Sequence, residues 1–284
     1  MLYEKNGFNC ILYNFLKEEF ANASISLIGQ GWSSVVFQVN DYIVRFPKQN
    51  MEDYEKEQNI CDHISNKISV AVPSVIIYKN KKHPYVIHKK IEGLKWNQHT
   101  VCQLSDKNED RLAQSLAQFF HTLHQQTTGY IAPDFIPVEF DTLGAFLQEN
   151  ADRNLTQLAL SKYKNALEVP KNQQKKVLIH GDFTPDNSVL DCNMRLCGVF
   201  DWCNCGMGDA ITDFIPLYTH LSKEFLMLVI SHYRTYSNQP FDFERFKMLF
   251  LLRHMYLLYW KYQNTTNGVN KINNMLASIL NKVK

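Results

Sequence analysis

The sequence predicts an α+β protein of two lobes, a small mixed lobe followed by a larger and mainly helical one. Short β-rich runs cluster in residues 1–92, whereas helical periodicity dominates residues 93–284. A chain of 284 residues, of which 45% are hydrophobic, can bury a substantial core without disulfides or metals. We expect a hinge at about residues 87–93, and clefts between such lobes are where ligands bind.

Charge and composition exclude several classes of protein. Thirty Lys and Arg residues against 28 Asp and Glu residues leave a formal net charge of +2, which argues against a nucleic-acid partner recruited by bulk electrostatics. No run approaches the length of about 18 apolar residues that a transmembrane helix needs, and the N-terminus lacks a signal-peptide layout. We therefore expect a cytoplasmic protein with no membrane partner.

The seven cysteines fit reduced thiols better than a disulfide framework. Four of them lie close in sequence, at Cys192, Cys197, Cys203 and Cys205. They contain no Cys-x2-Cys pair, and this spacing suits tetrahedral zinc poorly. Small buried thiols are therefore favoured over a zinc site.

In the small lobe, the periodicity predicts an opening helix, five short strands and one inserted helix. The opening helix covers residues 11–20, and the inserted helix covers residues 51–66. The strands cover residues 24–28, 34–39, 42–46, 75–78 and 85–91. Asn40 and Asp41 form a tight turn between the second and third strands. These elements predict a five-stranded sheet with one helix packed against it.

The large lobe is expected to be mostly helical, with two apolar strands near its middle. Ser105 can cap a helix whose apolar face runs from Leu112 to Leu123. Further helices are expected over residues 141–149, 154–167 and from 213 to the end, with an aromatic-rich stretch at 241–262. The strands cover residues 177–179 and 196–200, with a turn signal at 191–193.

The residues with the clearest chemistry follow the first of these strands. His180, Asp182 and Asn187 form a His-x-Asp-x4-Asn motif, and Asp201 ends the second apolar run. Phosphoryl transfer needs a carboxylate that deprotonates the acceptor hydroxyl, and oxygen ligands for the metal ions that neutralise the phosphates. The alternative is a polar turn, because Asp, Asn, Gly and Pro are common turn formers; Asp186 is better explained as such a turn residue.

A glycine-containing loop in the small lobe is a second, weaker signal. Gly29 and Gly31 lie between two predicted strands, so backbone amides there can approach phosphates closely. Ser33 and Ser34 could donate hydroxyl hydrogen bonds to phosphate oxygens, although Ser34 stands where a full Gly-x-Gly-x-x-Gly motif has glycine. A plain hairpin turn explains the glycines equally well.

A cation on the third strand completes the predicted phosphate site. Arg45 is permanently charged and can clamp two phosphate oxygens, whereas Lys48 falls beyond Pro47 and outside the strand. Glu57, in the middle of the inserted helix, could hold that cation, and Glu55 lies roughly 200° around the same helix. A solvated charged helix face is the alternative explanation for Glu57.

These motifs resemble the aminoglycoside phosphotransferase and choline kinase-like family, which shares the bilobal protein-kinase-like fold. The resemblance covers essentially the whole chain and is strongest at residues 180–187 and 199–201. It implies that Asp182 is the catalytic base, that Asn187 and Asp201 bind Mg²⁺, and that His180 braces the loop. Arg45 then stands where the kinase pattern has lysine, and Glu57 resembles the helix glutamate that pairs with it.

The resemblance also implies the substrates. The γ-phosphate of ATP or GTP would pass to a hydroxyl, with an aminoglycoside antibiotic as the expected acceptor in a resistance-type enzyme. The hinge, Ile87 to Ile91 and including Lys89, would offer backbone groups to the purine of the nucleoside triphosphate. Two runs with acidic but no basic residues, 134–152 and 201–220, could attract a polyamine sugar; solvated helix faces explain them equally well.

Several alternatives stay open at this point. A set of aromatic residues could hold a quaternary ammonium such as choline, although core packing is the simpler explanation: Trp202, Tyr218, Tyr256, Tyr259, Trp260 and Tyr262. The acceptor could also be a sugar or a macrolide. Because Ser34 and Arg45 depart from the kinase pattern, a nucleotide-binding regulator without turnover is the alternative outside enzymes. Asp209 and Asp213 are expected to cap helices and fix loops.

Overall fold

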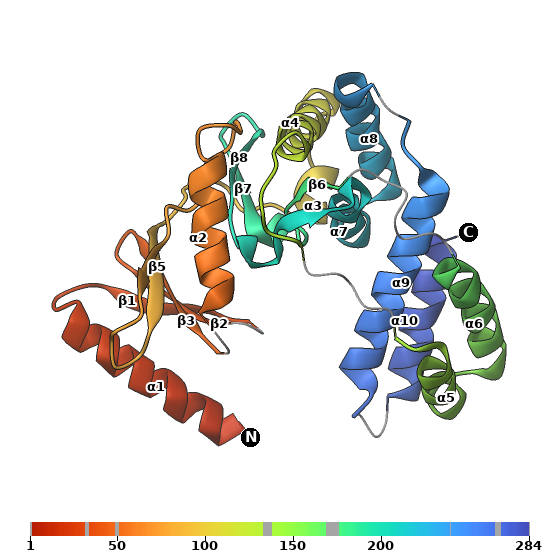
Figure 1. Ribbon diagram of the computed structural model, residues 1–284, viewed down its shortest axis with the longest axis horizontal. Coiled ribbons are helices and arrows are strands. Elements are labelled where there is room, and N and C mark those ends of the chain that lie inside the picture. The colour runs from red at the N-terminus through yellow and green to blue at the C-terminus, as the bar shows by residue number, and fades with distance from the viewer. Residues whose placement is uncertain are drawn as a thin grey trace.

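The computed structural model describes residues 2–31, 34–48, 51–132, 138–168, 176–238, 240–264 and 268–283. Within these residues a small lobe built on one antiparallel sheet adjoins a larger, mainly helical lobe (Figure 1). The predicted α+β, two-lobed architecture is therefore confirmed. In the described part of the chain, no helix has the length and apolar character needed to cross a membrane.

The small lobe contains the five predicted strands in the order β1-β2-β3-β5-β4. Its elements are α1 (Leu2–Glu19), β1 (Ile25–Gln30), β2 (Ser34–Val39), β3 (Tyr42–Pro47), α2 (Glu52–Ile64), β4 (Ile76–Tyr78) and β5 (Tyr85–Lys89). Each pair of neighbouring strands is antiparallel. Asn40 adopts φ 50° in the β2–β3 turn, a left-handed conformation that asparagine tolerates.

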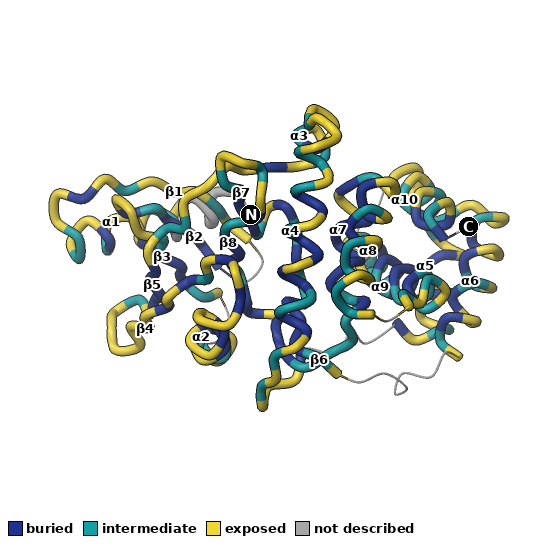
Figure 2. The backbone as a smooth tube through the Cα atoms, turned by 90° about the horizontal axis from the view of Figure 1, so that it is seen from above, coloured by how far each residue is buried: buried dark blue, intermediate teal, exposed yellow. Residues whose placement is uncertain are grey.

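The two faces of this sheet pack against different helices. Val44 and Phe46 of β3 lie in the same buried cluster as Leu12 and Leu16 of α1. Side chains alternate across a strand, so Arg45 lies on the opposite face, where it contacts α2. In Figure 2 the buried stretches run through the strands of the small lobe and continue through α4 of the large lobe.

The large lobe is composed of seven longer helices, one short helix and short strands and turns among the described residues. Its helices are α3 (Gln98–Cys102), α4 (Asp106–His124), α5 (Phe140–Asn150), α6 (Arg153–Leu167), α7 (Phe214–His220), α8 (Lys223–Ser237), α9 (Phe243–Tyr262) and α10 (Val269–Lys282). Helix α3 was not predicted, and its start is marked by a capping box between Asn97 and Thr100. Ser105 occupies the predicted N-cap position of α4, but its side chain makes no capping hydrogen bond. The predicted position is therefore correct and the predicted side-chain cap is wrong.

The short strands of the large lobe form two separate pairs. Strand β6 (Val177–Ile179) pairs with β9 (Gly206–Gly208), and β7 (Ser188–Leu190) pairs with β8 (Leu196–Val199). The predicted turn at residues 191–193 therefore joins β7 to β8. Asp191 fixes this turn, because its Oδ1 accepts hydrogen bonds from the backbone N–H groups of Asn193 and Arg195.

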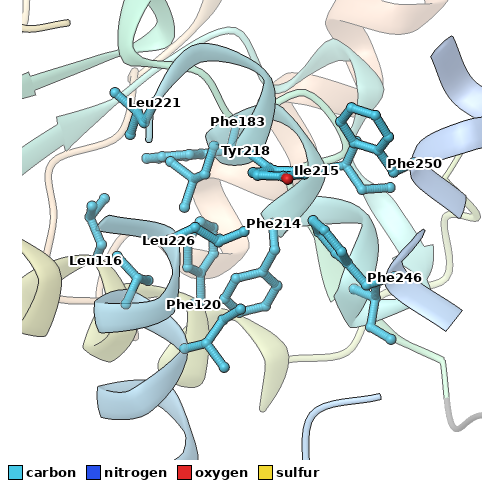
Figure 3. Close-up of a cluster of buried hydrophobic side chains, with 14 of the residues drawn as sticks. Leu116, Phe120, Phe183, Phe214, Ile215, Tyr218, Leu221, Leu226, Phe246 and Phe250 are labelled. Carbon is cyan, nitrogen blue, oxygen red and sulfur yellow. The ribbon is translucent and has the colours of Figure 1, made fainter. Parts of the chain in front are cut away.

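Aromatic and aliphatic side chains from α4, α7, α8 and α9 form the core of the large lobe. Phe120, Phe214 and Phe225 are fully buried, and the rings of Phe120 and Phe214 lie 5.0 Å apart between centroids. Phe183 of the loop after β6 belongs to the same cluster, 5.0 Å from Phe120 (Figure 3). This loop is therefore anchored in the core by one aromatic side chain.

The lobes are joined by backbone pairing as well as by the chain itself. Leu94, just after β5, exchanges two backbone hydrogen bonds with Leu190 of β7, at 2.8 and 3.0 Å. Ala71, between α2 and β4, pairs with the strand residues beside Gly198 of β8. The β7–β8 hairpin therefore lies directly against the small lobe, and so do the loops that flank it.

Glycine is required at position 206, and this requirement gives a stability prediction. Gly206 has φ +152°, and a Cβ there would lie 2.2 Å from the backbone nitrogen of Ala132. We expect Gly206→Ala to lower the free energy of unfolding by about 3 kcal/mol, because backbone cannot move aside as a flexible side chain can. Urea denaturation measures this change.

Gly144→Ala is the matched control for that substitution. Gly144 lies inside α5, where a Cβ would meet only Leu160 Cδ1 at an ordinary 3.8 Å. This change should raise the unfolding free energy by about 0.5–1 kcal/mol, because alanine loses less backbone entropy in a helix. Equal effects at the two positions would contradict the close-approach argument for Gly206.

Candidate active site

The candidate catalytic residues lie on two loops that the β7–β8 hairpin brings side by side. Asp182 and Asn187 belong to the segment between β6 and β7, and Asp201 follows β8. The backbone N–H of Phe200 donates to the carbonyl of Asn187 at 3.0 Å. Asn187 Nδ2 in turn donates to the carbonyl of Asp182 at 3.0 Å. The structure therefore brings the three predicted residues together.

His180 fixes the relative position of these loops from inside the protein. Its Nδ1 accepts a hydrogen bond from the backbone N–H of Asp182 at 3.3 Å, so the proton of the neutral ring resides on Nε2. Nε2 donates to the carbonyl of Phe200 at 3.2 Å. The ring is fully buried against Trp202, 4.6 Å between centroids. This geometry agrees with the bracing role expected from the sequence.

Asp213 holds the start of the catalytic loop, as its predicted loop-fixing role requires. Its carboxylate is fully buried and accepts hydrogen bonds from the backbone N–H groups of His180 at 3.0 Å and Gly181 at 2.8 Å. His124 Nε2 lies 3.1 Å from the same carboxylate, and Tyr233 bonds the other ring nitrogen. His124 and Tyr233 were not predicted, since their nearest site partners are more than thirty residues away in sequence.

Asp201 has an unusual backbone conformation and a perturbed carboxylate. Its φ and ψ are both 64°, in the left-handed region that costs free energy for residues with a Cβ and that clusters at functional sites. Partial loss of solvent raises the pKa of the Asp201 carboxyl and nearby Glu57 raises it further, whereas Arg45 lowers it. The side chain remains 45% exposed, so a cation from solvent can reach it.

A buried ion pair joins the small lobe to the Asp201 loop. Arg45 Nη2 donates to Glu57 Oε2, and both side chains are buried. Glu57 Oε1 accepts the backbone N–H of Trp202, the residue after Asp201, at 3.2 Å. The predicted choice of Glu57 agrees with this geometry, because Glu55 instead pairs with exposed Lys79.

Arg45 retains hydrogen-bonding capacity that the protein does not use. Its Nη1 lies 3.8 Å from Asp201 Oδ1, and its buried Nε has no hydrogen-bond partner among the described residues. The guanidinium carbon lies 5.0 Å from the centroid of the Tyr54 ring, which holds the charged group in place by a cation–π contact. An anion bound beside Asp201 would complete these contacts.

The described residues support only part of the predicted phosphate-binding role of the glycine loop. Gly31 is exposed at the end of the β1–β2 hairpin, and no atom lies within 4 Å of the position of a Cβ. Gly29 faces Val36 and belongs to a β-bulge. Ser34 is buried at the start of β2, so its hydroxyl is not available on the exposed loop. Ser33 lies outside the described residues.

The structure also places Lys48, which follows the third strand, and the predicted hinge residues Ile87 and Lys89. Lys48 lies beyond β3 and donates to the carbonyl of Gly31, so it is a second cation near the loop. Ile87 is buried inside β5 and pairs with both Val44 and Ile76. Its backbone N–H and carbonyl groups therefore lie within the sheet, between two neighbouring strands. The prediction that they contact the purine is wrong. Lys89, at the end of β5, has an exposed side chain and pairs on one side only.

The donor set suits a magnesium ion held jointly with phosphates. Asn187 uses its Nδ2 on the Asp182 carbonyl, which leaves the amide oxygen as a ligand, and Asp201 adds a carboxylate. No three His, Cys, Asp or Glu side chains gather into a metal site anywhere in the described ranges. Burial raises the pKa of the Cys203 and Cys205 thiols, so they are neutral. Two oxygen ligands plus a triphosphate satisfy Mg²⁺, which keeps several waters.

Arg253 is the residue that sequence reasoning missed. It lies on α9, and its Nη2 donates to Asp182 Oδ1 at 2.7 Å across a separation of 71 residues. Its Nη1 donates to the carbonyl of Gly181 at 3.2 Å. The only signal in the sequence is one arginine directly after an apolar run, Leu249 to Leu252, where a charged side chain needs a partner.

The predicted acidic and aromatic acceptor surfaces lose several of their members, although Tyr256, Tyr259 and Trp260 do lie together on α9. Asp209 is bonded to Arg245, Asp213 is buried, and Asp134 lies outside the described residues. The remaining acids of the first run have exposed side chains: Glu139, Asp141, Glu149 and Asp152. Trp202 is fully buried and Tyr218 nearly so, which excludes them from an exposed aromatic box.

Solved structures with the same fold bind nucleotides. The GDP and kanamycin complex of APH(2")-IIia superposes with a TM-score of 0.74 at 18% identity, covering 96% of this chain and 97% of that one. The streptomycin–ATP–APH(2")-IIa ternary complex gives 0.61 at 21% identity, with 96% and 94% coverage. Macrolide 2'-phosphotransferase MphH from Brachybacterium faecium, an apoenzyme, gives 0.63 at 15% identity, with 95% and 98% coverage. At these identities the likeness establishes the kinase-like fold.

A match to a protein family covers both lobes and the candidate site. The model of the phosphotransferase enzyme family matches residues 24–249. This range contains Arg45, Glu57, Asp182, Asn187 and Asp201, and it includes most of the 284 residues. On this match and this fold, the chain belongs to the phosphotransferase enzyme family.

Proposed function

We propose that this phosphotransferase moves the γ-phosphoryl group of ATP or GTP to a hydroxyl of a small molecule. Residues 1–92 would bind the nucleotide, residues 93–284 would supply the catalytic loop and the acceptor site, and residues 87–93 would form the hinge. The observation that carries the proposal is the juxtaposition of Asp182, Asn187 and Asp201 beside the buried Arg45–Glu57 pair.

Asp182 is the catalytic base in this proposal. Arg253 occupies its Oδ1, and within the described residues no side chain is bonded to Oδ2, which can accept the proton of the acceptor hydroxyl. The hydroxyl oxygen forms a bond to the γ-phosphorus as the bond to the β–γ bridging oxygen breaks. The proton passes to Asp182, and the products are ADP or GDP and a phosphate monoester.

Arg45 binds the phosphates of the donor, and Glu57 and Tyr54 position it. The unpartnered Nε and the Nη1 near Asp201 support this assignment, because both donors lie beside the carboxylate that would share the metal. The Gly31 N–H already donates to the Ser34 carbonyl at 3.0 Å, so the cation Lys48, rather than the predicted amides of Gly29 and Gly31, would adjoin the same phosphates. The purine would contact backbone at the end of β5, from Lys89 to Ile91, rather than at Ile87.

Asn187 and Asp201 would hold Mg²⁺, which neutralises phosphate charge when it is bound. Burial raises the pKa of the Asp201 carboxyl, and a divalent cation bound beside it would favour the ionised form. His180 and Asp213 fix the loop that carries Asn187, so both ligands are presented from rigid positions.

Aminoglycosides are the first acceptor class to test, since neighbouring structures hold kanamycin or streptomycin. Macrolides are the second, because MphH shares the fold and because Leu257 and Trp260 expose apolar surface on α9, the helix that carries Arg253.

The full chain should transfer phosphate from Mg-ATP or Mg-GTP to a member of these two classes, and the mass of the product measures this transfer. Nucleotide binding without turnover on any acceptor would favour a regulator instead. All seven cysteines are free thiols, which supports a location in the reducing cytoplasm.

Asp182→Asn should lower kcat by about 10²–10⁴-fold, since the amide cannot accept the hydroxyl proton. Nucleotide affinity, measured by calorimetry, should change by less than about threefold because the base does not contact the donor. Thermal unfolding of the variant controls for the loss of the Arg253 ion pair. A variant that retains wild-type turnover would remove Asp182 from the mechanism.

Asp201→Asn should raise the Mg²⁺ concentration needed for half-maximal nucleotide binding by at least about tenfold, because a neutral amide is a weaker ligand than a carboxylate. Asparagine also tolerates the left-handed backbone at this position, so the loop should keep its shape. Titration calorimetry at graded Mg²⁺ gives the readout without turnover. Asp186→Asn is the matched control, since Asp186 is exposed on the neighbouring loop between β6 and β7 and should leave the Mg²⁺ requirement unchanged.

A further inference from the structure

Asp182 has a well-fixed backbone, but its backbone bonds do not fix its side chain. The Asp182 N–H donates to His180 Nδ1 at 3.3 Å, and the Asp182 carbonyl accepts from Asn187 Nδ2 at 3.0 Å. The last torsion of an aspartate side chain joins a tetrahedral carbon to a planar one, and such torsions have broad preferences. The backbone alone therefore does not determine which carboxylate oxygen faces an acceptor hydroxyl.

Arg253 makes the one side-chain hydrogen bond to this carboxylate within the ranges that the structure describes. Its Nη2 donates to Asp182 Oδ1 at 2.7 Å. Hydrogen bonds between a guanidinium and a carboxylate are short and strong, because both groups are charged. The bond restrains the plane of the carboxylate and leaves Oδ2 as the oxygen for an acceptor hydroxyl.

The guanidinium is itself tied to the backbone of the catalytic loop. Its Nη1 donates to the carbonyl of Gly181 at 3.2 Å, one residue before the proposed base. Gly181 is held in turn by Asp213, whose Oδ1 accepts the Gly181 N–H at 2.8 Å. Two bonds from two nitrogens of one planar group fix both its position and its rotation, which a lysine ammonium cannot do.

Helix α9 gives Arg253 a rigid support. Phe250 and His254 lie in the same turn of this helix, and both are buried. Their rings stack at 3.9 Å between centroids, and His254 Nε2 lies 2.9 Å from Thr219 Oγ1 of α7. The arginine therefore extends from a well-packed helix turn toward the catalytic loop.

A contribution to stability explains the Arg253–Asp182 pair poorly. The Arg253 side chain is 22% exposed and that of Asp182 is 36% exposed. Ion pairs that water can reach typically add little to stability, because solvent compensates for the loss of either partner. The pair nevertheless joins residues 71 apart in sequence, and one of them is the proposed base. Its main consequence is the orientation of the Asp182 carboxylate.

We propose that Arg253 is a positioning residue for phosphoryl transfer, which holds Asp182 by Oδ1 so that Oδ2 receives the proton of the acceptor hydroxyl. This inference rests on the proposed function. The hydroxyl oxygen forms its bond to the γ-phosphorus as the bond to the β–γ bridging oxygen breaks, and its proton passes to Oδ2. Arg253 stays protonated throughout and acts only through Asp182.

The test uses water as the acceptor, because hydrolysis of Mg-ATP and Mg-GTP by the full chain requires no identified acceptor. Phosphate release gives kcat, and calorimetry with a non-hydrolysable analogue gives nucleotide affinity. Arg253→Ala should lower kcat by about 10–100-fold, since a misplaced catalytic group loses rate steeply. Nucleotide affinity should stay within about threefold. Arg253→Lys, which keeps the charge, should turn over at least about threefold faster than Arg253→Ala.

A double variant distinguishes positioning from direct contact with the reacting groups. In the Asp182→Asn background, Arg253→Ala should lower kcat by less than about twofold, because no base remains to be positioned. Arg245→Ala is the matched control, since Arg245 also lies on α9 and pairs with a carboxylate, Asp209, at 2.7 Å. It should keep kcat within about threefold. Thermal unfolding of every variant checks that the fold is retained.

Four outcomes overturn the inference. They are wild-type kcat in Arg253→Ala, an equal loss in Arg245→Ala, a lysine variant no faster than the alanine variant, and a further tenfold loss in the double variant. If Arg253→Ala alone retains wild-type hydrolysis, the inference is wrong and the proposed function stands. If Asp182→Asn retains it as well, the proposed base itself is wrong, and the inference fails with it.

Discussion

The buried pair of Arg45 and Glu57 is the interaction on which the two halves of the site depend. Glu57 accepts from Arg45 on one side and from the backbone N–H of Trp202 on the other, so one carboxylate connects β3, α2 and the Asp201 turn. Removing one partner of a buried pair leaves an uncompensated charge, which typically costs about 3–5 kcal/mol. The small lobe therefore holds the proposed phosphate-binding cation and also fixes the backbone beside the proposed metal ligand Asp201.

The catalytic loop is held in a different way, by hydrogen bonds to its own backbone. Asp213 accepts from two successive N–H groups, His180 bridges Asp182 and Phe200, and Asn187 bonds the Asp182 carbonyl. Phe183 anchors the same loop in the aromatic core. Because these contacts use backbone atoms and buried rings, the Asp182 carboxylate remains partly exposed, with Arg253 on its Oδ1.

The acceptor differs among the proteins that share this fold. Structural neighbours at 15–21% identity share the fold across nearly the full chain, yet two of them bind kanamycin or streptomycin and a third is a macrolide phosphotransferase. In this chain α9 supplies Arg253 beside the proposed base and exposes Leu257 and Trp260. One fold can therefore serve proteins with several different acceptors.

The sequence by itself determined the longer helices, the five-stranded sheet and the candidate residues of the donor site, but not α3, β7 or β9. Alternation in β3, helical spacing in α2 and the His-x-Asp-x4-Asn motif depend on neighbours a few residues apart, so Arg45, Glu57, Asp182, Asn187 and Asp201 could be chosen without a structure. Ile87 was wrongly chosen because strand pairing on both sides, which occupies its backbone, is a tertiary fact. The roles of Arg253, His124 and the buried Asp213 were likewise decided by tertiary structure. Their partners lie tens of residues away, and local periodicity carries no information about which distant side chains the folded chain brings together.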